Sequence, residues 1–328
     1  MTDPDILKAL GPLAPLYSDL AVREIMVDAP ERVLVERKGQ LQDAGVTFRS
    51  EAALREVMEA LLALGGLKLA AGQTIGDTRL PDGARLLAIY PPTAPNGPYL
   101  VIRKMFVTRL SWEQLIEWDV ITPAMQELLR QACRAHVNML VAGGPGSGKT
   151  TFANLLTELI PAEERLVVVE EAKELQVRHA RTIYLESAAP ANVPIDELLS
   201  TASKMRPDWL IVGELSGPAV VRALEIFGHG HTGLTTLHAT SVEDALGRLE
   251  VMCLKANLGL GLGEIRAMIA SALRLITFQE KLPSGARKIT HMMELRGMEN
   301  DRYVLCPLFR YSAASGKLEP TGEPPGWA

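Results

Sequence analysis

The sequence lacks the features of an exported or membrane-spanning protein. Its three cysteines, Cys133, Cys253 and Cys306, are scattered and include no C-x-x-C pair, which favours reduced thiols over a disulfide or zinc framework. The acidic start, MTDPDILKAL, has no basic region followed by an apolar run, as a signal peptide would. No apolar stretch reaches the roughly 18 residues that a spanning helix needs. We therefore expect a cytoplasmic chain that reaches a membrane only through partners.

An excess of positive charge is also missing. The 34 Lys and Arg residues are outnumbered by 39 Asp and Glu residues, which gives a formal net charge of −5. No overall basic field therefore indicates nucleic acid, although the pore of a ring can still be basic locally. With 328 residues, 47% of them hydrophobic, the chain is long enough for two domains with their own cores.

The first part of the chain predicts a small α+β domain over residues 1–105. Short strand-like runs alternate with one amphipathic helix, which opens with a serine N-cap. The last two strands flank a loop rich in Pro, Gly and Asn. We expect a mostly antiparallel sheet. The predicted strands cover residues 24–27, 32–37, 80–92 and 98–104, and the predicted helix covers residues 50–64.

After a predicted linker over residues 106–121, which includes a connecting helix, the pattern changes. Apolar strands now alternate with helices, and two of the strands are continuously apolar, as strands buried on both faces of a parallel sheet are. This alternation predicts a doubly wound α/β domain with a mainly parallel sheet over residues 122–328. The Pro/Gly-rich tail from Glu319 is expected to fray. The predicted helices cover residues 123–136, 151–160, 194–205 and 217–227, and the predicted strands cover residues 138–143, 165–171 and 208–214.

A phosphate-binding loop is predicted where the first strand of this domain passes into a helix. GGPGSGKT matches G-x-x-x-x-G-K-[ST] at every fixed position. Its glycines let backbone N–H groups curl around phosphate oxygens, and the following helix adds its positive end. Lys149 is expected to reach the β- and γ-phosphates and Thr150 to bind Mg²⁺. The alternative is a chance glycine-rich turn, which the strand-to-helix context disfavours. The predicted nucleotide-binding residues are Gly143, Gly144, Pro145, Gly146, Ser147, Gly148, Lys149, Thr150 and Thr151.

Carboxylates follow two of the other buried strands. Glu214 comes at the end of residues 208–214, where side chains of open α/β sheets face a nucleotide. It is a candidate for organising Mg²⁺ and the attacking water. Glu170 and Glu171 end residues 165–171, with Glu174 further on, and Glu170 is the candidate to polarise the water. The alternatives are a solvent-facing strand end for Glu214 and a charged helix start for the other three.

Histidines gather in FGHGHTGLTTLHAT, which holds His229, His231 and His238. No cysteine or carboxylate completes a zinc-binding spacing there. A γ-phosphate sensor is a better hypothesis for His238 and His231. For either residue considered alone, a hydrogen-bonded structural histidine remains the simpler interpretation.

Four ordered motifs together resemble the secretion ATPase superfamily of type II and type IV secretion, conjugation and pilus-assembly motors. GGPGSGKT resembles its Walker A motif and VVVEEAKEL its Asp box. MRPDWLIVGELSGP resembles its Walker B segment, and GHTGLTTLHATS its His box. The compact two-domain chain is most similar to Tad (Flp) pilus-assembly or conjugation members. The resemblance implies a RecA-like second domain and an ATP-hydrolysing, Mg²⁺-dependent motor subunit that serves secretion or pilus assembly across the cell envelope.

The resemblance also assigns roles to single residues. Glu170, Glu214 and His238 match catalytic positions, and Thr150, Glu171 and Glu214 would surround the metal. In the first domain, Arg85 and Arg103 would contact the γ-phosphate, with Arg79 a weaker candidate; the alternative for each is a surface cation. The resemblance further implies a homo-hexamer on the inner face of the membrane that works on an inner-membrane platform protein. The acidic balance of the chain leads us to expect no direct nucleic-acid contact.

The chain departs from the family pattern at several positions. Glu171 stands where the Asp box usually has Asp, Ser216 replaces the usual Arg after Glu214, and Ala219 replaces a common Glu. The run from Phe227 to His231 lacks the usual Thr-Gly-His. These departures leave open a catalytically weak nucleotide-gated scaffold. A second alternative is a RecA-like nucleic-acid translocase that uses the same P-loop, which the acidic balance of the chain disfavours. The sequence does not identify the transported substrate, the direction of the motor or the symmetry of the ring.

Overall fold

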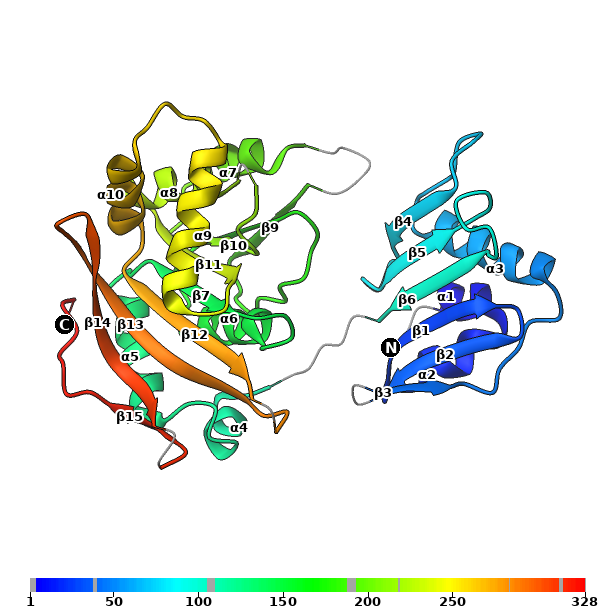
Figure 1. Cartoon of the computed structure of the whole chain (residues 1–328), viewed down its shortest axis with the longest axis horizontal. Helices are drawn as coiled ribbons and strands as arrows, with labels where there is room; N and C mark the ends of the chain where they lie inside the picture. The colour runs from blue at the N-terminus through cyan, green and yellow to red at the C-terminus, as the bar shows by residue number, and fades with distance from the viewer. Residues whose placement is uncertain are drawn as a thin grey trace. The chain divides into compact units, whose positions relative to one another are not determined.

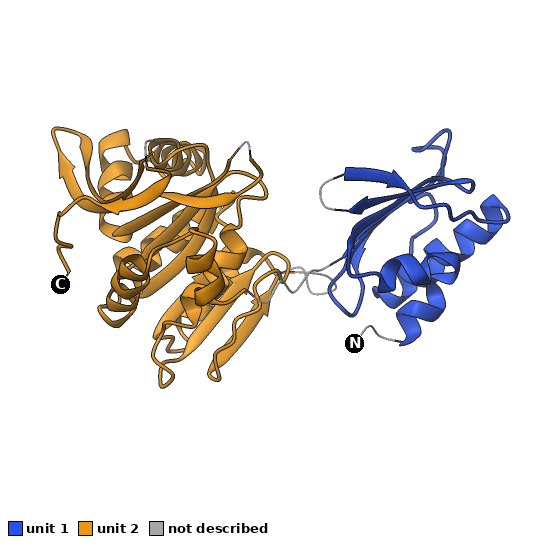
Figure 2. Ribbon diagram, turned by 90° about the horizontal axis from the view of Figure 1, so that it is seen from below, with its two compact units in different colours: residues 1–107 blue, residues 108–328 orange. Residues whose placement is uncertain are grey.

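The computed structural model describes residues 4–37, 40–104, 110–187, 193–217, 219–282, 284–312 and 315–327. The chain divides into two compact units, residues 1–107 and 108–328, which are coloured separately in Figure 2. Each unit has its own hydrophobic core and is described by itself. Within the described residues, no helix combines the length and apolar character needed to cross a membrane.

Unit 1 is built on a six-stranded, fully antiparallel sheet with the order β3-β2-β1-β6-β5-β4. Its longest helix, α3, begins after the predicted N-cap Ser50, whose side chain accepts a hydrogen bond from the Ala53 N–H. The strands are β1 (Val22–Ala29), β2 (Arg32–Arg37), β3 (Gln40–Asp43), β4 (Ile75–Arg79), β5 (Arg85–Ile89) and β6 (Tyr99–Arg103). The helical segments are α1 (Pro4–Ala9), η1 (Gly11–Leu13), α2 (Ala14–Ser18) and α3 (Glu51–Leu64).

One face of this sheet is covered and the other is open. The helices pack on one face, as Figure 2 shows for the blue unit. Alternate strand residues such as Ile25, Leu86 and Ile102 point into the core between sheet and helices and are fully buried. Their neighbours in the strands therefore lie on the opposite face. The predicted α+β domain with a mostly antiparallel sheet is confirmed.

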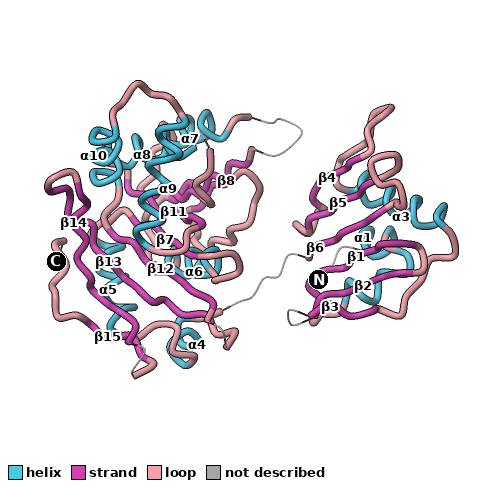
Figure 3. Tube along the Cα trace, viewed as in Figure 1, coloured by secondary structure: helices cyan, strands magenta, loops and turns pink. Residues whose placement is uncertain are grey.

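Unit 2 contains a nine-stranded sheet with the order β15-β14-β13-β12-β7-β11-β10-β8-β9. The strands from β12 to β9 run parallel, and β13 to β15 extend the sheet antiparallel, along the left side in Figures 1 and 3. The strands are β7 (Met139–Gly143), β8 (Leu166–Glu170), β9 (Thr182–Glu186), β10 (Trp209–Val212), β11 (Thr232–His238), β12 (Leu275–Lys281), β13 (Arg287–Glu299), β14 (Arg302–Ser312) and β15 (Lys317–Pro320). The helices are α4 (Trp112–Glu117), α5 (Pro123–Arg134), α6 (Lys149–Thr157), α7 (Ile195–Ser203), α8 (Ala219–Gly228), α9 (Val242–Lys255) and α10 (Leu262–Ala272).

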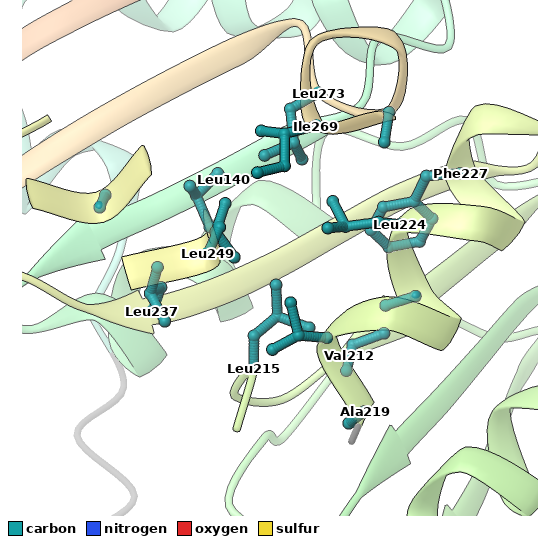
Figure 4. Packing of buried hydrophobic residues seen from close by; sticks show 14 of the residues in the cluster. Leu140, Val212, Leu215, Ala219, Leu224, Phe227, Leu237, Leu249, Ile269 and Leu273 are labelled. Carbon is teal, nitrogen blue, oxygen red and sulfur yellow. The ribbon is translucent and has the colours of Figure 1, made fainter. Parts of the chain in front are cut away.

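Both faces of the parallel part are buried, as its continuously apolar strands predict. In β7, Leu140 and Ala142 belong to the core that contains α7 to α10, whereas Met139 and Val141 belong to the core that contains α4 to α6. Figure 4 shows the first of these cores, with Leu224 of α8 among the residues packed over the strands. The doubly wound, mainly parallel domain is therefore confirmed.

Two parts of unit 2 differ from the expectations. The helix expected in the linker is α4, and it buries Trp112 and Leu115 in the core of unit 2; the linker residues 105–109 lie outside the described part. The tail is not frayed, which corrects the prediction. Glu294 is fully buried and accepts a hydrogen bond from the Gly326 N–H at 3.0 Å, and Trp327 packs against the α4–α6 core.

Candidate nucleotide-binding and hydrolysis site

The four motifs meet at one edge of the parallel sheet. The phosphate-binding loop follows β7, His238 ends β11, Glu214 follows β10, and Glu170 ends β8. These are four adjacent strands in the sheet order β7-β11-β10-β8. Because the carboxyl ends of parallel strands lie at the same edge, residues almost 100 positions apart in the sequence become neighbours.

The loop has the backbone that its glycines predict. Gly146 and Gly148 adopt φ angles of +68° and +103°, conformations that side chains with a Cβ rarely adopt. Gly148 is the N-cap of α6, which begins at Lys149. The loop therefore ends at the positive end of a nine-residue helix, a suitable position for binding phosphate.

Two donors of the loop share one acceptor. The Lys149 ammonium donates to the Gly144 carbonyl oxygen at 3.1 Å, and the Ser147 N–H donates to the same oxygen at 3.3 Å. Both donors therefore point toward the inside of the loop. Burial lowers the pKa of Lys149, while the nearby carboxylates of Glu214 and Glu174 act in the opposite direction.

His238 connects the loop to the Walker B carboxylate. Its Nδ1 lies 3.0 Å from the Lys149 ammonium nitrogen, and its Nε2 lies 3.3 Å from an oxygen of Glu214. Its ring thus bridges a cation and a carboxylate. Of the predicted site residues, these three are in direct contact.

Glu170 is held in an almost closed environment at the end of β8. Glu170 is 4% exposed. Its Oε1 accepts hydrogen bonds from the N–H groups of Glu174 and Leu175 at 3.1 and 3.0 Å. A side chain at Gly213 would collide with Glu170, because a Cβ there would lie 2.7 Å from the Glu170 Cγ. Burial raises the pKa of Glu170 to about 7, although the two N–H bonds act in the opposite direction. Its Oε2 has no hydrogen-bond partner among the described residues.

Glu171 and Ser216 lie in contact beside these residues. The Ser216 hydroxyl donates to the Glu171 Oε1 at 2.8 Å. Both residues are positions at which the chain departs from the family pattern. The contact is exposed. It therefore lies on the surface at this edge of the sheet and is not part of the core.

The oxygen donors at this edge suit Mg²⁺. Thr150 stands in the first turn of α6 and Glu214 follows β10. Mg²⁺ usually takes one or two carboxylates together with water and phosphate oxygens, so a hydroxyl and a carboxylate are a sufficient protein contribution. No cluster of three or more His, Cys, Asp and Glu side chains that could enclose a metal occurs in the described part of the chain. The third expected ligand, Glu171, has one oxygen bonded to Ser216.

The three candidate arginines form a row on the open face of unit 1. Arg79 lies opposite Arg85, and Arg85 lies opposite Arg103. Arg85 also forms an ion pair with Asp77 at 2.9 Å, and Glu24 lies opposite Arg103. Like charges in opposite positions destabilise a sheet, and the neighbouring Asp77 and Glu24 offset part of this repulsion. Their action on a nucleotide remains a prediction.

Some features of this edge were assigned wrongly or missed. His231 precedes β11, whereas His238 ends it, and seven residues of extended strand span about 20 Å. The sensor role suggested for His231 is therefore wrong. Arg287 was missed, although its Nε donates to the Gly146 carbonyl oxygen at 2.8 Å. No local sequence signal identifies a contact between residues 141 positions apart.

These features define the class of the protein, a P-loop nucleotide-binding α/β domain preceded by an antiparallel α+β domain. The family model described as "Type II/IV secretion system protein" matches residues 7–316. The chain belongs to this family, which confirms the resemblance to the secretion ATPase superfamily. It is thus a member of the ATPases that serve secretion and pilus assembly.

Individual relatives agree with this assignment. A putative conjugal transfer protein of Mycobacterium tuberculosis is 30% identical over 306 residues, covering 89% of this chain and 86% of that protein. The conjugal transfer protein TrbB of Rhizobium radiobacter is 30% identical over 296 residues, covering 87% of each chain. The solved structure of the pilus retraction motor PilT with bound ADP has a TM-score of 0.64 at 17% identity, covering 92% of this chain and 83% of that one. At this identity the likeness shows the fold alone.

Proposed function

We propose that this chain is the Mg²⁺-dependent, ATP-hydrolysing motor subunit of a machine for secretion or pilus assembly. The observation that carries the proposal is the contact series from Lys149 through His238 to Glu214, with distances of 3.0 and 3.3 Å. These residues come from the Walker A, His box and Walker B motifs. A cation that binds phosphate is therefore coupled through one imidazole to a carboxylate that can organise metal and water.

Binding of ATP would involve the loop and the first turn of α6. The N–H groups from Gly146 to Thr151 and the Lys149 ammonium bind the phosphates. The hydroxyl of Thr150 and the carboxylate of Glu214 hold Mg²⁺, which neutralises charge on the β- and γ-phosphates. His238 contacts the end of Lys149 and so responds to the γ-phosphate.

Glu170 is the residue we assign to the attacking water. A base works best when its pKa is near the working pH, and the pKa of Glu170 is raised to about 7. The two backbone N–H groups hold one of its oxygens in place. The other oxygen has no hydrogen-bond partner among the described residues but is buried, so the attacking water would have to reach it from inside the site to give it a proton.

The developing charge on the phosphate needs cations from outside the loop. Arg85 and Arg103, with Arg79 beside them in the same row, are the residues of unit 1 that we assign to this task. An arginine contact of this kind can change the rate by orders of magnitude.

The finer parts of the proposal follow from the family. The motor works as a homo-hexamer, in the cytoplasm at the inner face of the cell membrane. It acts on an inner-membrane platform protein that assembles pilin-like subunits or drives another substrate. The conjugal transfer relatives support a type IV secretion or Tad-like setting.

Steady-state phosphate release with Mg·ATP tests the proposal, with the oligomeric size measured in the same samples. Turnover is expected to appear with ring formation and to fall at least about 100-fold in Lys149→Ala and Glu214→Gln, the size of losing a key electrostatic contact. Lys255→Ala, which removes an exposed lysine at the end of α9, is the matched control. Tight ATP binding without turnover in a wild-type ring would contradict the motor.

That last outcome describes the second candidate, a nucleotide-gated scaffold. The contact between Ser216 and Glu171 is the observation that favours it. One oxygen of Glu171, a carboxylate expected near the metal, accepts a hydrogen bond from the neutral hydroxyl of Ser216. The resemblance places an arginine at the position of Ser216. A scaffold would still bind ATP and form rings, so turnover separates the two candidates.

A further inference from the structure

A hairpin from the far end of the chain lies against the phosphate-binding loop. Its first strand, β12, pairs in parallel with β7, and Gln279 lies opposite Gly143, the first residue of the loop. Its second strand, β13, begins at Arg287, which lies opposite Lys281 of β12. The hairpin therefore brings two basic residues to the edge of the sheet where the loop begins.

Only one of these two residues bonds to the loop. The Arg287 Nε donates to the Gly146 carbonyl oxygen at 2.8 Å. Its Cδ lies 3.5 Å from the position that a Cβ on Gly148 would occupy. The side chain thus extends along three consecutive loop residues, with its methylene groups over Gly148 and its guanidinium at Gly146.

This hydrogen bond fixes the orientation of a peptide group. In a planar trans peptide the C=O and the N–H point in opposite directions. Holding the carbonyl of Gly146 on the outside therefore turns the N–H of Ser147 to the inside. There the Ser147 N–H donates to the Gly144 carbonyl oxygen, the oxygen that also accepts from Lys149.

The bond to the loop is the polar contact that the structure describes for the Arg287 side chain. Within the described residues, this side chain donates one hydrogen bond, to Gly146, and takes part in no ion pair. The residue is exposed, so it contributes little to the core. Its guanidinium therefore acts on the loop more than on the stability of the hairpin.

We propose that Arg287 is a positioning residue for the phosphate-binding loop. By holding the Gly146 carbonyl, it keeps the Ser147 N–H directed at the phosphates of a bound nucleoside di- or triphosphate. This rests on the proposed nucleotide hydrolysis. Because its Nε is bonded to the Gly146 carbonyl oxygen, we assign Arg287 to the loop and not to the transferred phosphate, and its effect is expected to fall on affinity and to leave the chemical step unchanged.

The test compares Arg287→Met with Lys281→Met, which removes the same charge from the opposite position of the hairpin without touching the loop. Dissociation constants for ADP and for a non-hydrolysable Mg·ATP analogue are measured beside kcat at saturating ATP. Arg287→Met is expected to weaken both ligands about tenfold, the size supported by one charge-assisted hydrogen bond. Its kcat stays within about threefold of the wild type, and Lys281→Met stays within about twofold in every value.

Arg287→Lys provides the second arm, because lysine keeps a donor that can reach the carbonyl. Its affinity is expected to lie between those of the wild type and Arg287→Met. If Arg287→Met does not fold, as judged by thermal unfolding, Arg287→Leu, which also lacks a donor, takes its place and the same order is expected.

Equal affinities for Arg287→Met and Lys281→Met would overturn the inference, as would a loss of kcat with unchanged affinity. In either case a wild-type protein that still binds and hydrolyses ATP leaves the proposed function intact. A wild-type protein and a Lys281→Met variant that both fail to bind nucleotide would instead remove the proposed function, and the inference with it.

Discussion

The hydroxyl of Ser216 donates a hydrogen bond to the carboxylate of Glu171 at 2.8 Å. Two positions at which the chain departs from its family, 45 residues apart in the sequence, are therefore in contact. Glu171 is longer than the Asp of the family pattern, and Ser216 is shorter than its Arg. The extra methylene of Glu171 extends its carboxylate so that it reaches the Ser216 hydroxyl.

This contact predicts that the two positions are coupled. Ser216→Ala and Glu171→Gln should each lower kcat/KM for ATP hydrolysis, and the double variant should lose less than the sum of the two. The expected coupling is about 0.5–1 kcal/mol, as for an exposed hydrogen bond. A double-mutant cycle on phosphate release measures it. Ser271→Ala, on α10, is the control, and strictly additive effects would show that the pair does not act as a unit.

His238 should affect turnover far more than binding of the diphosphate. Its side chain contacts the Lys149 ammonium and Glu214, and its place in the strand lies opposite Gly143. We expect His238→Ala to lower kcat at least about tenfold and to change the affinity for ADP less than threefold. The control is His231→Ala, at the opposite end of β11. An equal loss of kcat in His238→Ala and His231→Ala would contradict the role assigned to His238.

Glu170 should give turnover a pH dependence. The proposed base works only when ionised, and its pKa is about 7. We therefore expect kcat to fall about tenfold for each pH unit below 7. Glu170→Gln should be at least about 100-fold slower than the wild type and should lose this dependence. A wild-type rate that stays constant between pH 5 and 8, measured by phosphate release, would refute the role.

The same carboxyl should destabilise the fold at high pH. Burial raises its pKa from the ordinary value of 4.5 to about 7 in the folded chain, so the folded state binds the proton more tightly. Its contribution to stability is therefore greatest below pH 4.5 and is lost as the pH rises through 7. The unfolding free energy of Glu170→Gln, measured relative to that of the wild type, should therefore increase by about 1–3 kcal/mol when the pH is raised from 5 to 8. Urea unfolding at the two pH values measures this, with the exposed Glu197→Gln as a control that shows no such gain.

Glu294 should be the most sensitive position of the C-terminal region. It is fully buried, and it pairs with Arg274 at 2.8 Å and Arg296 at 2.9 Å. Removing one partner of a buried charge cluster costs about 3–5 kcal/mol, so we expect Glu294→Ala to lose about 3 kcal/mol of unfolding free energy. Glu299→Ala, at the exposed end of the same strand, should lose less than about 0.5 kcal/mol. Similar losses in the two variants would contradict the prediction.

The site could be predicted to a large extent because its chemistry is local at each strand end. The loop from Gly143, the glutamates at or just after the ends of β8 and β10 and the N-cap Ser50 each depend on a few consecutive residues. In a parallel sheet the carboxyl ends of the strands all lie at one edge, so these residues come together as soon as the sheet forms. Lys149, His238 and Glu214 therefore lie close together, while their catalytic roles stay predictions.

Other parts depend on long-range partners and were out of reach. The tail from Glu319 has the composition of a loose end, but Glu294 and Arg296 supply partners for its backbone. Arg287 looks like any surface cation until the hairpin brings it to Gly146. His231 and His238 share one motif, and only the direction of β11 shows that they lie at opposite ends of a strand.

The Gly144 carbonyl oxygen gives the loop an acceptor of its own. Because the Lys149 ammonium and the Ser147 N–H both donate to it, a phosphate oxygen that takes these donors displaces a neutral acceptor already in use. Binding is then an exchange of hydrogen-bond partners. Its free energy depends on how much more strongly these donors bond to a charged phosphate oxygen than to the neutral carbonyl oxygen. Weakly charged anions would gain little from that exchange, so we expect this acceptor in the loop's own backbone to favour polyphosphates over them.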